Sequence, residues 1–321
     1  LLIAAVAQAQ TLTGTAVGAE RPGGPSLVGA LWVPATGAPY AERTTTGPFI
    51  ERLKSMPFNE YLIQVRAGGN AYYDSALVPR APGVSESFDP LQELIAGLRQ
   101  PPREKRLVAW FDPYHVGNLN DAAPLGANHV MLTHREWLSQ RANGDQAGDR
   151  GDLYLEPGLP AVQEHLEAVV RELLTRYDLD VLYIDHMGDA VEGDWGFHPD
   201  VVQRWRQETG ATGNPTPDDP QWQAFRARIL TEALRGLVTA AREARPGIVI
   251  GVGLTAEGAP PRSAADYRSC TIFTRTHQDL PEWLTVNGVD RLYVRNFHSD
   301  AEGQNRNFDE WLKLTVAMAG E

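Results

Sequence analysis

The feature that most constrains the fold is a helix followed at once by a short strand and an aspartate, in residues 160–186. Apolar residues recur there at three- and four-residue intervals, as on one helix face: Val162, Leu166, Val169, Val170, Leu173, Leu174 and Tyr177. The run Val181–Ile184 is too short for a helix and rich in β-forming residues, so it predicts a buried strand ending at Asp185 and His186. β/α barrels place catalytic groups at such strand tips, although a carboxylate that only solvates a loop would give the same pattern.

The same alternation of strand and helix extends along the whole chain. Strands are predicted at residues 27–34, 60–66, 106–111, 181–185, 248–252, 271–274 and 291–294. Helices are predicted at residues 48–56, 90–98 (capped by Asp89), 160–177, 222–244 and 308–318. This order demands a mostly parallel sheet and favours an α/β fold, a single-domain (β/α)8 TIM barrel. About seven strands are visible where a closed barrel needs about eight, so either the last strand lies beyond Glu321 or the leader fills the gap.

Composition narrows the range of partners. The chain has 321 residues, 42% of them hydrophobic, and a formal net charge of −12, so it can bury a large core. The acidic balance argues against nucleic acid or an anionic membrane surface as a partner and is compatible with a neutral glycan. Cys270 is the only cysteine, which excludes an intrachain disulfide. No sequence feature indicates an oligomeric state.

The first residues predict a cellular location. Residues 1–9 form an apolar run ending in Ala7-Gln8-Ala9, which is typical of the end of a secretory signal peptide; a first strand or a disordered leader is the alternative. The run is too short to span a bilayer, and we predict no integral membrane segment. We therefore expect a signal-peptide remnant at 1–9, an extended leader at 10–26 and the barrel at 27–321. The expected location is the periplasm, the cell envelope or the extracellular space.

Polar side chains gather at the predicted strand ends. The candidate catalytic residues are carboxylates: Asp185 as nucleophile or electrostatic stabiliser, and Asp112 or Glu257 as the partner acid. The candidate substrate-binding residues are amide, aromatic and basic side chains at the same ends: Arg66, Asn70, Tyr72, Tyr114, His186, Trp195 and Asn296. Glycoside hydrolysis needs one carboxyl that donates a proton and one that is ionised, and aromatic rings stack on sugars. A separation of about 5 Å between the two carboxyls would predict retention, and a wider one inversion.

Other chemistries have weaker support. The chain has no Gly-x-Ser-x-Gly elbow and no phosphate-binding loop, and Gly251-Val252-Gly253 is a very weak dinucleotide signal. Asp185, His186 and Asp189 suggest a metal-assisted hydrolase or deacetylase as a lesser alternative, but no spaced His pair supports it, so we predict no metal and no cofactor. The other histidines singled out are predicted to be surface or packing residues: His115, His129, His134, His165 and His277.

Several sequence blocks, in order, resemble the glycosyl hydrolase-like 10 family of bacterial TIM-barrel glycosidases, from about residue 27 to residue 297. The blocks are Ile63–Arg66, Ala71–Ser75, Phe88–Leu91, Ala109–Tyr114, His134–Leu138, Leu155–Gly158 and Tyr177–Asp185. The resemblance implies a secreted or envelope enzyme that acts on a bacterial glycan, with peptidoglycan strands as the substrate class. Asp185 matches the family's strand-four aspartate, and Arg66 and Trp110 match cleft-lining positions.

The chain also departs from the family pattern. Asn70 stands where the family usually has Asp, and Asp112 stands where it usually has Asn. His186 occupies the place of a second acidic residue, Gly253-Leu254 replaces Ser-Pro, and Val294-Arg295 replaces Pro-Gln. These changes are compatible with a rearranged acid/base pair. They are equally compatible with a barrel that binds glycan through Arg66, Tyr72, Tyr114 and Trp195 without cutting it.

Overall fold

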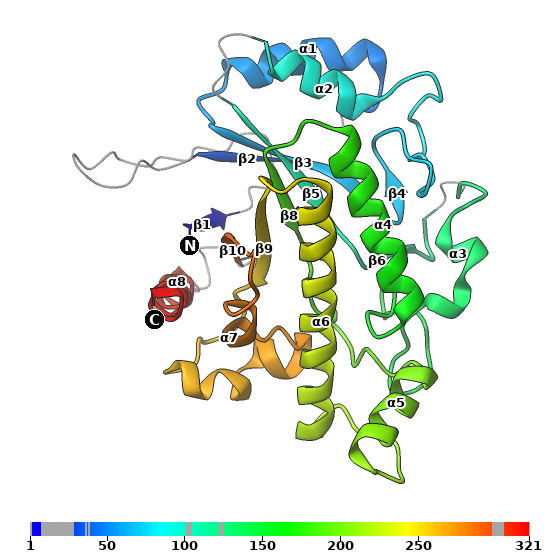
Figure 1. The fold of residues 1–321 in the computed structure, drawn as a ribbon, viewed down its shortest axis with the longest axis vertical. Helices are drawn as coiled ribbons and strands as arrows, with labels where there is room; N and C mark the ends of the chain where they lie inside the picture. Colours follow the sequence, from blue (N-terminus) through cyan, green and yellow to red (C-terminus); the bar gives the residue numbers. More distant parts are fainter. Residues whose placement is uncertain are drawn as a thin grey trace.

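The computed structural model describes residues 2–7, 29–35, 37, 39–100, 105–121, 125–296 and 305–320. They form an α/β fold in which helices cover a curled, mainly parallel sheet (Figure 1). The strands are β1 Leu2–Ala7, β2 Ala30–Val33, β3 Glu60–Ala67, β4 Asn70–Ala71, β5 Arg106–Phe111, β6 His115–Asn118, β7 Asp152–Tyr154, β8 Val181–Ile184, β9 Val249–Thr255 and β10 Arg291–Asn296. The helices are α1 Arg43–Ser55, α2 Pro90–Leu98, α3 Val130–Thr133, α4 Pro160–Arg176, α5 Pro199–Thr209, α6 Pro220–Ala244, α7 Leu280–Trp283 and α8 Asn305–Gly320. Short 3₁₀ turns span Arg135–Trp137 and Ala264–Ser269.

The sheet has the strand order β1-β10-β9-β8-β5-β3-β2 and parallel pairing along that path, with β4 antiparallel to β3. The predicted α/β barrel architecture is confirmed, as a curled half-barrel whose edge strands β1 and β2 are not paired with each other in the described chain. Strand β1 lies beside β10, where a last barrel strand is needed. The signal-peptide interpretation of this segment stays a prediction, and the predicted leader at 10–26 lies outside the described residues.

One predicted strand is wrong. Residues 271–274 do not form a strand, because Ile272–Thr276 is a π-helical turn that ends at His277 in the left-handed region, with φ +56°. Threonine hydroxyls satisfy backbone carbonyls within this turn: Thr276 Oγ1 donates to Ile272 O at 2.6 Å and Thr274 Oγ1 to Cys270 O at 3.2 Å. Such local side-chain bonds offer the backbone an alternative to a sheet ladder.

The interior of the half-barrel is filled by a cluster of buried apolar and aromatic side chains. They are Leu62, Val108, Trp110, Val181, Tyr183 and Tyr293, from β3, β5, β8 and β10. In addition, Arg291 on β10 donates to both carboxylate oxygens of Glu60 on β3, at 2.8 and 3.1 Å. These two strands are not neighbours in the sheet, so the buried ion pair crosses the interior and holds the sheet in its curled form.

Helices α4 and α6 lie side by side on the outer face of the sheet (Figure 1). The apolar stripe predicted for α4 is buried in full, from Val162 to Leu174. In the described part of the chain, no helix combines the length and the apolar composition needed to cross a membrane.

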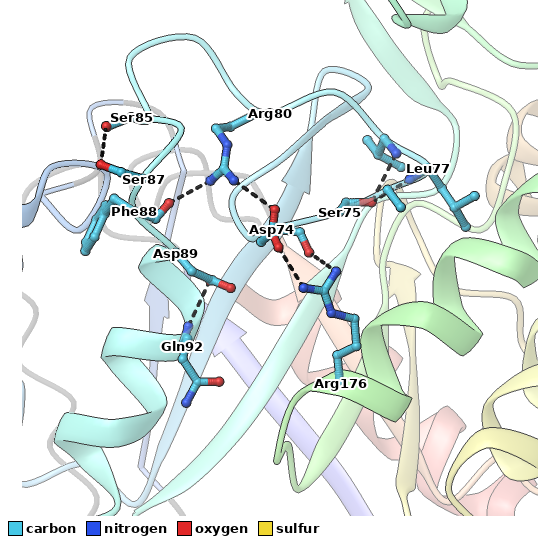
Figure 2. Close-up of polar contacts among 12 residues, drawn as sticks. Asp74, Ser75, Leu77, Arg80, Ser85, Ser87, Phe88, Asp89, Gln92 and Arg176 are labelled. Carbon is cyan, nitrogen blue, oxygen red and sulfur yellow. Dashed lines mark hydrogen bonds and ion pairs between the residues drawn. The ribbon is translucent and has the colours of Figure 1, made fainter.

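The segment between β4 and α2 is fixed to α4 by Asp74 (Figure 2). This carboxylate accepts from Arg80 at 2.9 Å and from Arg176 of α4 at 2.7 Å, while Arg80 also donates to the carbonyl oxygen of Phe88 at 2.6 Å. At the end of the segment, Asp89 accepts from the backbone N–H of Gln92 and caps α2, as predicted. Because the ion pairs of Asp74 are partly exposed, they order the segment but add little to global stability.

Candidate active site

Asp112 and Asp185 meet at the carboxyl-terminal edge of the sheet. Strands β5 and β8 are paired in parallel with Phe111 opposite Ile184, so the residue that follows each strand lies beside the other. Strand β9 ends at Thr255 and β10 brings Arg295 to the same edge, where its guanidinium lies 3.3 Å from the Thr255 hydroxyl. The structure thus brings together two of the three predicted carboxylates.

Asp185 is completely buried and surrounded by donors. Its Oδ1 accepts from the Tyr183 hydroxyl at 2.7 Å and the His186 backbone N–H at 2.8 Å, and forms an ion pair with Arg295 Nη1 at 2.5 Å. Its Oδ2 accepts from the Trp110 indole at 2.7 Å. A buried carboxylate with this many partners is held in one orientation.

One nitrogen of the His186 ring lies between the carboxylates of Asp112 and Asp185. His186 Nδ1 lies 3.2 Å from Asp112 Oδ2 and 3.3 Å from Asp185 Oδ2. Burial alone would raise the pKa of Asp112, but the charge and hydrogen bond of His186 outweigh it and hold the pKa at about 2. Asp112 is therefore ionised at neutral pH and does not hold the proton that a general acid needs.

Arg295 was not predicted as a site residue, although it stands at the end of a predicted strand and departs from the family pattern. Besides its ion pair with Asp185, its Nη1 lies 3.2 Å from His186 Nε2. The pairing joins β10 to the residues after β8 across a long sequence distance. In the sequence, the pairing is indicated only by an arginine within an apolar strand, because a buried arginine needs a buried carboxylate as its partner.

Most of the predicted substrate-binding residues are buried beneath the carboxyl-terminal edge of the sheet and are not exposed on its surface. Arg66 is buried and donates to the carbonyl oxygens of Asp112 at 2.5 Å and Pro113 at 3.1 Å, so it positions the loop after β5. Tyr114 and Trp195 are buried, and the Trp195 indole donates to Glu192 O at 2.9 Å.

The remaining predicted residues are placed apart from the two aspartates. Asn70 donates to Gly68 O, and Tyr72 is half-buried with its ring edge-on to that of Tyr40. Glu257 is half-buried beyond β9, and among the described residues no hydrogen bond or ion pair joins it to Asp185. Asn296 ends β10, and its side chain lies outside the described part.

Two aromatic residues lie beside Asp112 on the hairpin of β6 and β7, which interrupts a segment predicted as loop: His115, predicted as a surface or packing residue, and Tyr154, which was missed. The register of that hairpin sets His115 opposite Tyr154, with ring centroids 5.4 Å apart. The backbone N–H of His115 donates to Asp112 Oδ1 at 3.3 Å, and Tyr154 lines a small hollow with Trp195 and Asp189. Half-buried rings next to a carboxylate suit the apolar face of a sugar.

A second buried charge cluster supports the loop after β8. Arg226 of α6 donates to both carboxylate oxygens of Asp189, at 2.6 and 3.1 Å, and to Glu156 at 2.5 Å. His277 Nδ1 lies 2.8 Å from Asp189 Oδ2, so this histidine, predicted as a surface or packing residue, belongs to the cluster. The cluster fixes the loop three residues beyond His186.

The donor set does not fit a metal ion. Among the described residues, no group of three or more His, Cys, Asp and Glu side chains is arranged as a ligand set. The Arg295 guanidinium also places a positive charge on Asp185 and His186, the residues that the metal hypothesis requires.

Gly253 of β9 leaves room for the Tyr183–Asp185 hydrogen bond. A Cβ at this position would lie 2.6 Å from the Tyr183 hydroxyl and 3.0 Å from Asp185 Oδ1. We expect Gly253→Ala to lower the free energy of unfolding by about 1–3 kcal/mol through overpacking. Urea unfolding followed by tryptophan fluorescence measures this. Gly247→Ala is the matched control, because nothing lies within 4 Å of its Cβ; an equal effect of both variants would contradict the prediction.

The depressed pKa of Asp112 predicts a pH dependence of stability. A carboxyl whose pKa falls from 3.8 in the unfolded chain to about 2 in the folded chain stabilises the fold above pH 3.8, and the contribution is lost as the pH falls towards 2. The difference in unfolding free energy between wild type and Asp112→Asn should therefore shrink as the pH falls through that window. A difference that stays constant down to pH 2 would show that the pKa of Asp112 is not depressed.

A curled parallel half-barrel with helices on its outer face belongs to the class of TIM-barrel-like α/β folds, which carry their active sites at the carboxyl ends of the strands. The sequence pattern of the family described as "Glycosyl hydrolase-like 10" matches residues 29–311, and the chain belongs to this family. The chain is 27% identical over 262 residues to the glycosyl hydrolase DigH of Escherichia coli K12, which covers 76% of this chain and 55% of that protein. The chain thus spans about half the length of this curated relative.

Solved structures share the fold at low sequence identity. The glycoside hydrolase domain of PgaB (BpsB) from Bordetella bronchiseptica has a TM-score of 0.59 and 16% identity, covering 92% of this chain and 81% of that chain. A β-galactosidase from the psychrophilic Marinomonas ef1 has a TM-score of 0.55 and 8% identity, covering 84% of this chain and 40% of that chain. These likenesses concern the fold alone.

Proposed function

We propose that this chain hydrolyses glycosidic bonds in a bacterial polysaccharide, with peptidoglycan glycan strands as its substrate, by chemistry in which the carboxylate of Asp185 is central. The observation behind this proposal is the pair Asp112 and Asp185, from neighbouring strand ends, on one imidazole nitrogen of His186. Negative charge fixed at such an edge stabilises the oxocarbenium-like transition state of glycoside hydrolysis.

The geometry favours different roles for the two aspartates. Asp185 is fully buried and saturated with donors, which suits an electrostatic stabiliser better than a nucleophile. Asp112 lies closer to the surface and is ionised, so it is the carboxylate that faces the reacting sugar carbon. Among the described residues, no hydrogen bond or ion pair joins Glu257 to either aspartate, so Glu257 is the weaker candidate for the partner carboxyl.

Substrate class and location rest on the family and on the sequence. A relative named as a glycosyl hydrolase and a bacterial glycoside hydrolase domain of like fold support a glycan substrate. The apolar first residues support export to the periplasm, envelope or exterior, where peptidoglycan lies. Fractionation of cells that produce the natural full-length protein tests the location; protein confined to the cytoplasm would overturn it.

The test of the activity uses purified protein and peptidoglycan glycan strands freed of peptide. Product analysis by mass spectrometry should show shortened strands that increase with time.

A second candidate function is glycan binding without cleavage, favoured by the Arg295–Asp185 ion pair and by the ionised state of Asp112, which leave no carboxyl ready to donate a proton. Intact strands that co-sediment with the protein would support glycan binding and would contradict the proposed hydrolase activity.

A further inference from the structure

A small hollow lies between the β6–β7 hairpin and the loop after β8. Its walls are mainly apolar and aromatic, and they include Tyr154, Leu155, Pro157, Ala190 and Trp195. The ring of Tyr154 lies edge-on to that of Trp195, with ring centroids 5.0 Å apart, so one wall is a pair of packed aromatic rings. The hollow has room for about one water molecule or one methyl group. It is therefore too small for a sugar ring and suits a small substituent on such a ring.

The hollow lies beside Asp112, the carboxylate that faces the reacting sugar carbon. Tyr154 stands opposite His115 in the hairpin, and the His115 backbone N–H donates to Asp112 Oδ1 at 3.3 Å. The backbone N–H of Leu155 donates at 2.9 Å to the carbonyl oxygen of Tyr114, which follows Asp112 closely in the chain. Burial raises the pKa of Tyr154, and nearby carboxylates, Asp112 among them, raise it further. Because C2 of a sugar is bonded to the reacting C1, a substituent on C2 can enter the hollow while Asp112 faces C1.

The hydroxyl of Tyr154 is available to such a substituent. Among the described residues, no group forms a hydrogen bond with it, and its raised pKa keeps its proton in place at neutral pH. Asp189 also lines the hollow, but its two carboxylate oxygens already accept from Arg226, at 2.6 and 3.1 Å. It therefore does not offer a free anion to a cationic substituent. An apolar space beside a hydroxyl that can donate fits a neutral group with a methyl end and a carbonyl oxygen.

We propose that this hollow is a subsite for the acetamido group on C2 of an N-acetylated sugar. The proposal rests on the proposed glycosidase function and names the substituent by which the site recognises its substrate. The methyl group fills the space between Tyr154, Ala190 and Trp195, and the carbonyl oxygen accepts from the Tyr154 hydroxyl. Both sugars of peptidoglycan glycan strands carry this group, whereas glucose and galactose carry a hydroxyl on C2 that leaves the hollow unfilled.

The experiment varies the acyl group on one glycan. Peptide-free strands are de-N-acetylated enzymatically and then re-acylated with acetic or propionic anhydride, which gives two neutral ligands that differ by one methylene per acyl group. Binding is measured by co-sedimentation at 4 °C, and the strand length is checked afterwards by mass spectrometry. Wild type should bind the acetylated strands at least about tenfold more tightly than the propionylated ones, because the extra methylene does not fit a filled apolar space.

Two variants test whether this preference arises in the hollow. Ala190→Gly removes a methyl group from its wall and should bring the affinity for the propionylated strands to within about threefold of that for the acetylated ones. Ala96→Gly is the matched control and should keep the wild-type ratio, because Ala96 is exposed in the last turn of α2, which precedes the start of β5. Tyr154→Phe removes the hydroxyl and should weaken binding of the acetylated strands about three- to tenfold, with no loss on the de-N-acetylated strands.

Three results would overturn the subsite while leaving the glycosidase in place. They are equal binding of acetylated and propionylated strands by wild type, a ratio that Ala190→Gly does not change, and an equal loss of Tyr154→Phe on the de-N-acetylated strands. The first of these would mean that the hollow holds water only. Preferential binding of acetylated strands that stay intact would support the subsite and overturn the hydrolase activity. A wild type that binds none of the strands would overturn the proposed function, and the subsite with it.

Discussion

Asp185→Asn is expected to reduce turnover of peptidoglycan glycan strands by at least about 10³-fold. The substitution keeps the shape of the side chain but removes the negative charge that pairs with Arg295 and lies beside the His186 ring. With that charge gone, the site loses its stabilisation of the cationic transition state, and a buried guanidinium is left without its counter-ion.

Product analysis and a binding measurement on the same strands separate the possible outcomes. The variant should still bind the strands, because Asp185 is buried and does not touch the glycan. Asp178→Asn is the matched control: this aspartate precedes the same strand β8 at the opposite end of the sheet and is largely exposed. We expect it to retain wild-type turnover. Retained turnover of Asp185→Asn, with the fold verified by circular dichroism, would remove Asp185 from the centre of the site.

Loss of binding together with turnover would give a different result. It would mean that Asp185 acts by holding His186 and Arg295 in place for the substrate, rather than by stabilising the transition state. A His186→Asn variant then becomes informative, because it removes the exposed side chain of this group and leaves the Arg295–Asp185 ion pair intact.

The fold was predictable where local pattern and tertiary burial agree. Strand β5 and helix α2 begin and end at the predicted residues, because an apolar run or a capped apolar stripe fixes both limits. The π-helical turn at Ile272–Thr276 was not predictable, because its β-branched residues favour a strand and only their hydroxyl bonds to nearby carbonyls show otherwise. Helix α5 and the β6–β7 hairpin were missed for a similar reason, since both lie in segments with weak periodicity.

The candidate site was predictable only in part. Position at a strand end identifies Asp112, Asp185 and His186, but it does not reveal that one imidazole nitrogen joins both carboxylates. Departures from the family pattern at Asp112, His186 and Arg295 are separate in sequence and in direct contact in the structure. Each compensates for another: the carboxylate absent from position 186 has a counterpart at Asp112, and the histidine and arginine balance the charge. Such compensation depends on contacts between distant strands, which one sequence does not show.

Arg226 is a second case in which the sequence does not show the contacts between distant segments, here contacts that stabilise the fold. It lies on the buried face of α6, between the apolar residues Trp222 and Ile229. A charged residue there signals a buried carboxylate partner without identifying it. The structure provides two partners, Asp189 and Glu156, so one guanidinium from a helix neutralises the loop after β8 and the start of α4 together.

Arg226→Met is therefore expected to lower the free energy of unfolding by about 3–5 kcal/mol, the largest effect on stability that we predict. Methionine fills a similar volume, but Asp189 and Glu156 are left buried without the cation that holds the pKa of Asp189 well below its usual range. Urea unfolding followed by tryptophan fluorescence measures the change, with activity recorded under conditions where the variant is folded. We expect activity to fall as well, because the loop that Asp189 fixes begins beside His186.

Arg228→Met on the same helix is the control. Its ion pairs with Glu208 and Glu232 are about 41% exposed on the arginine side, so their loss should cost less than about 1 kcal/mol. Equal stability of Arg226→Met and Arg228→Met would mean that the buried carboxylates take up protons and do without the arginine. In that case, the stability of Arg226→Met would rise relative to wild type as the pH falls, because protonation relieves the uncompensated charge in the variant alone.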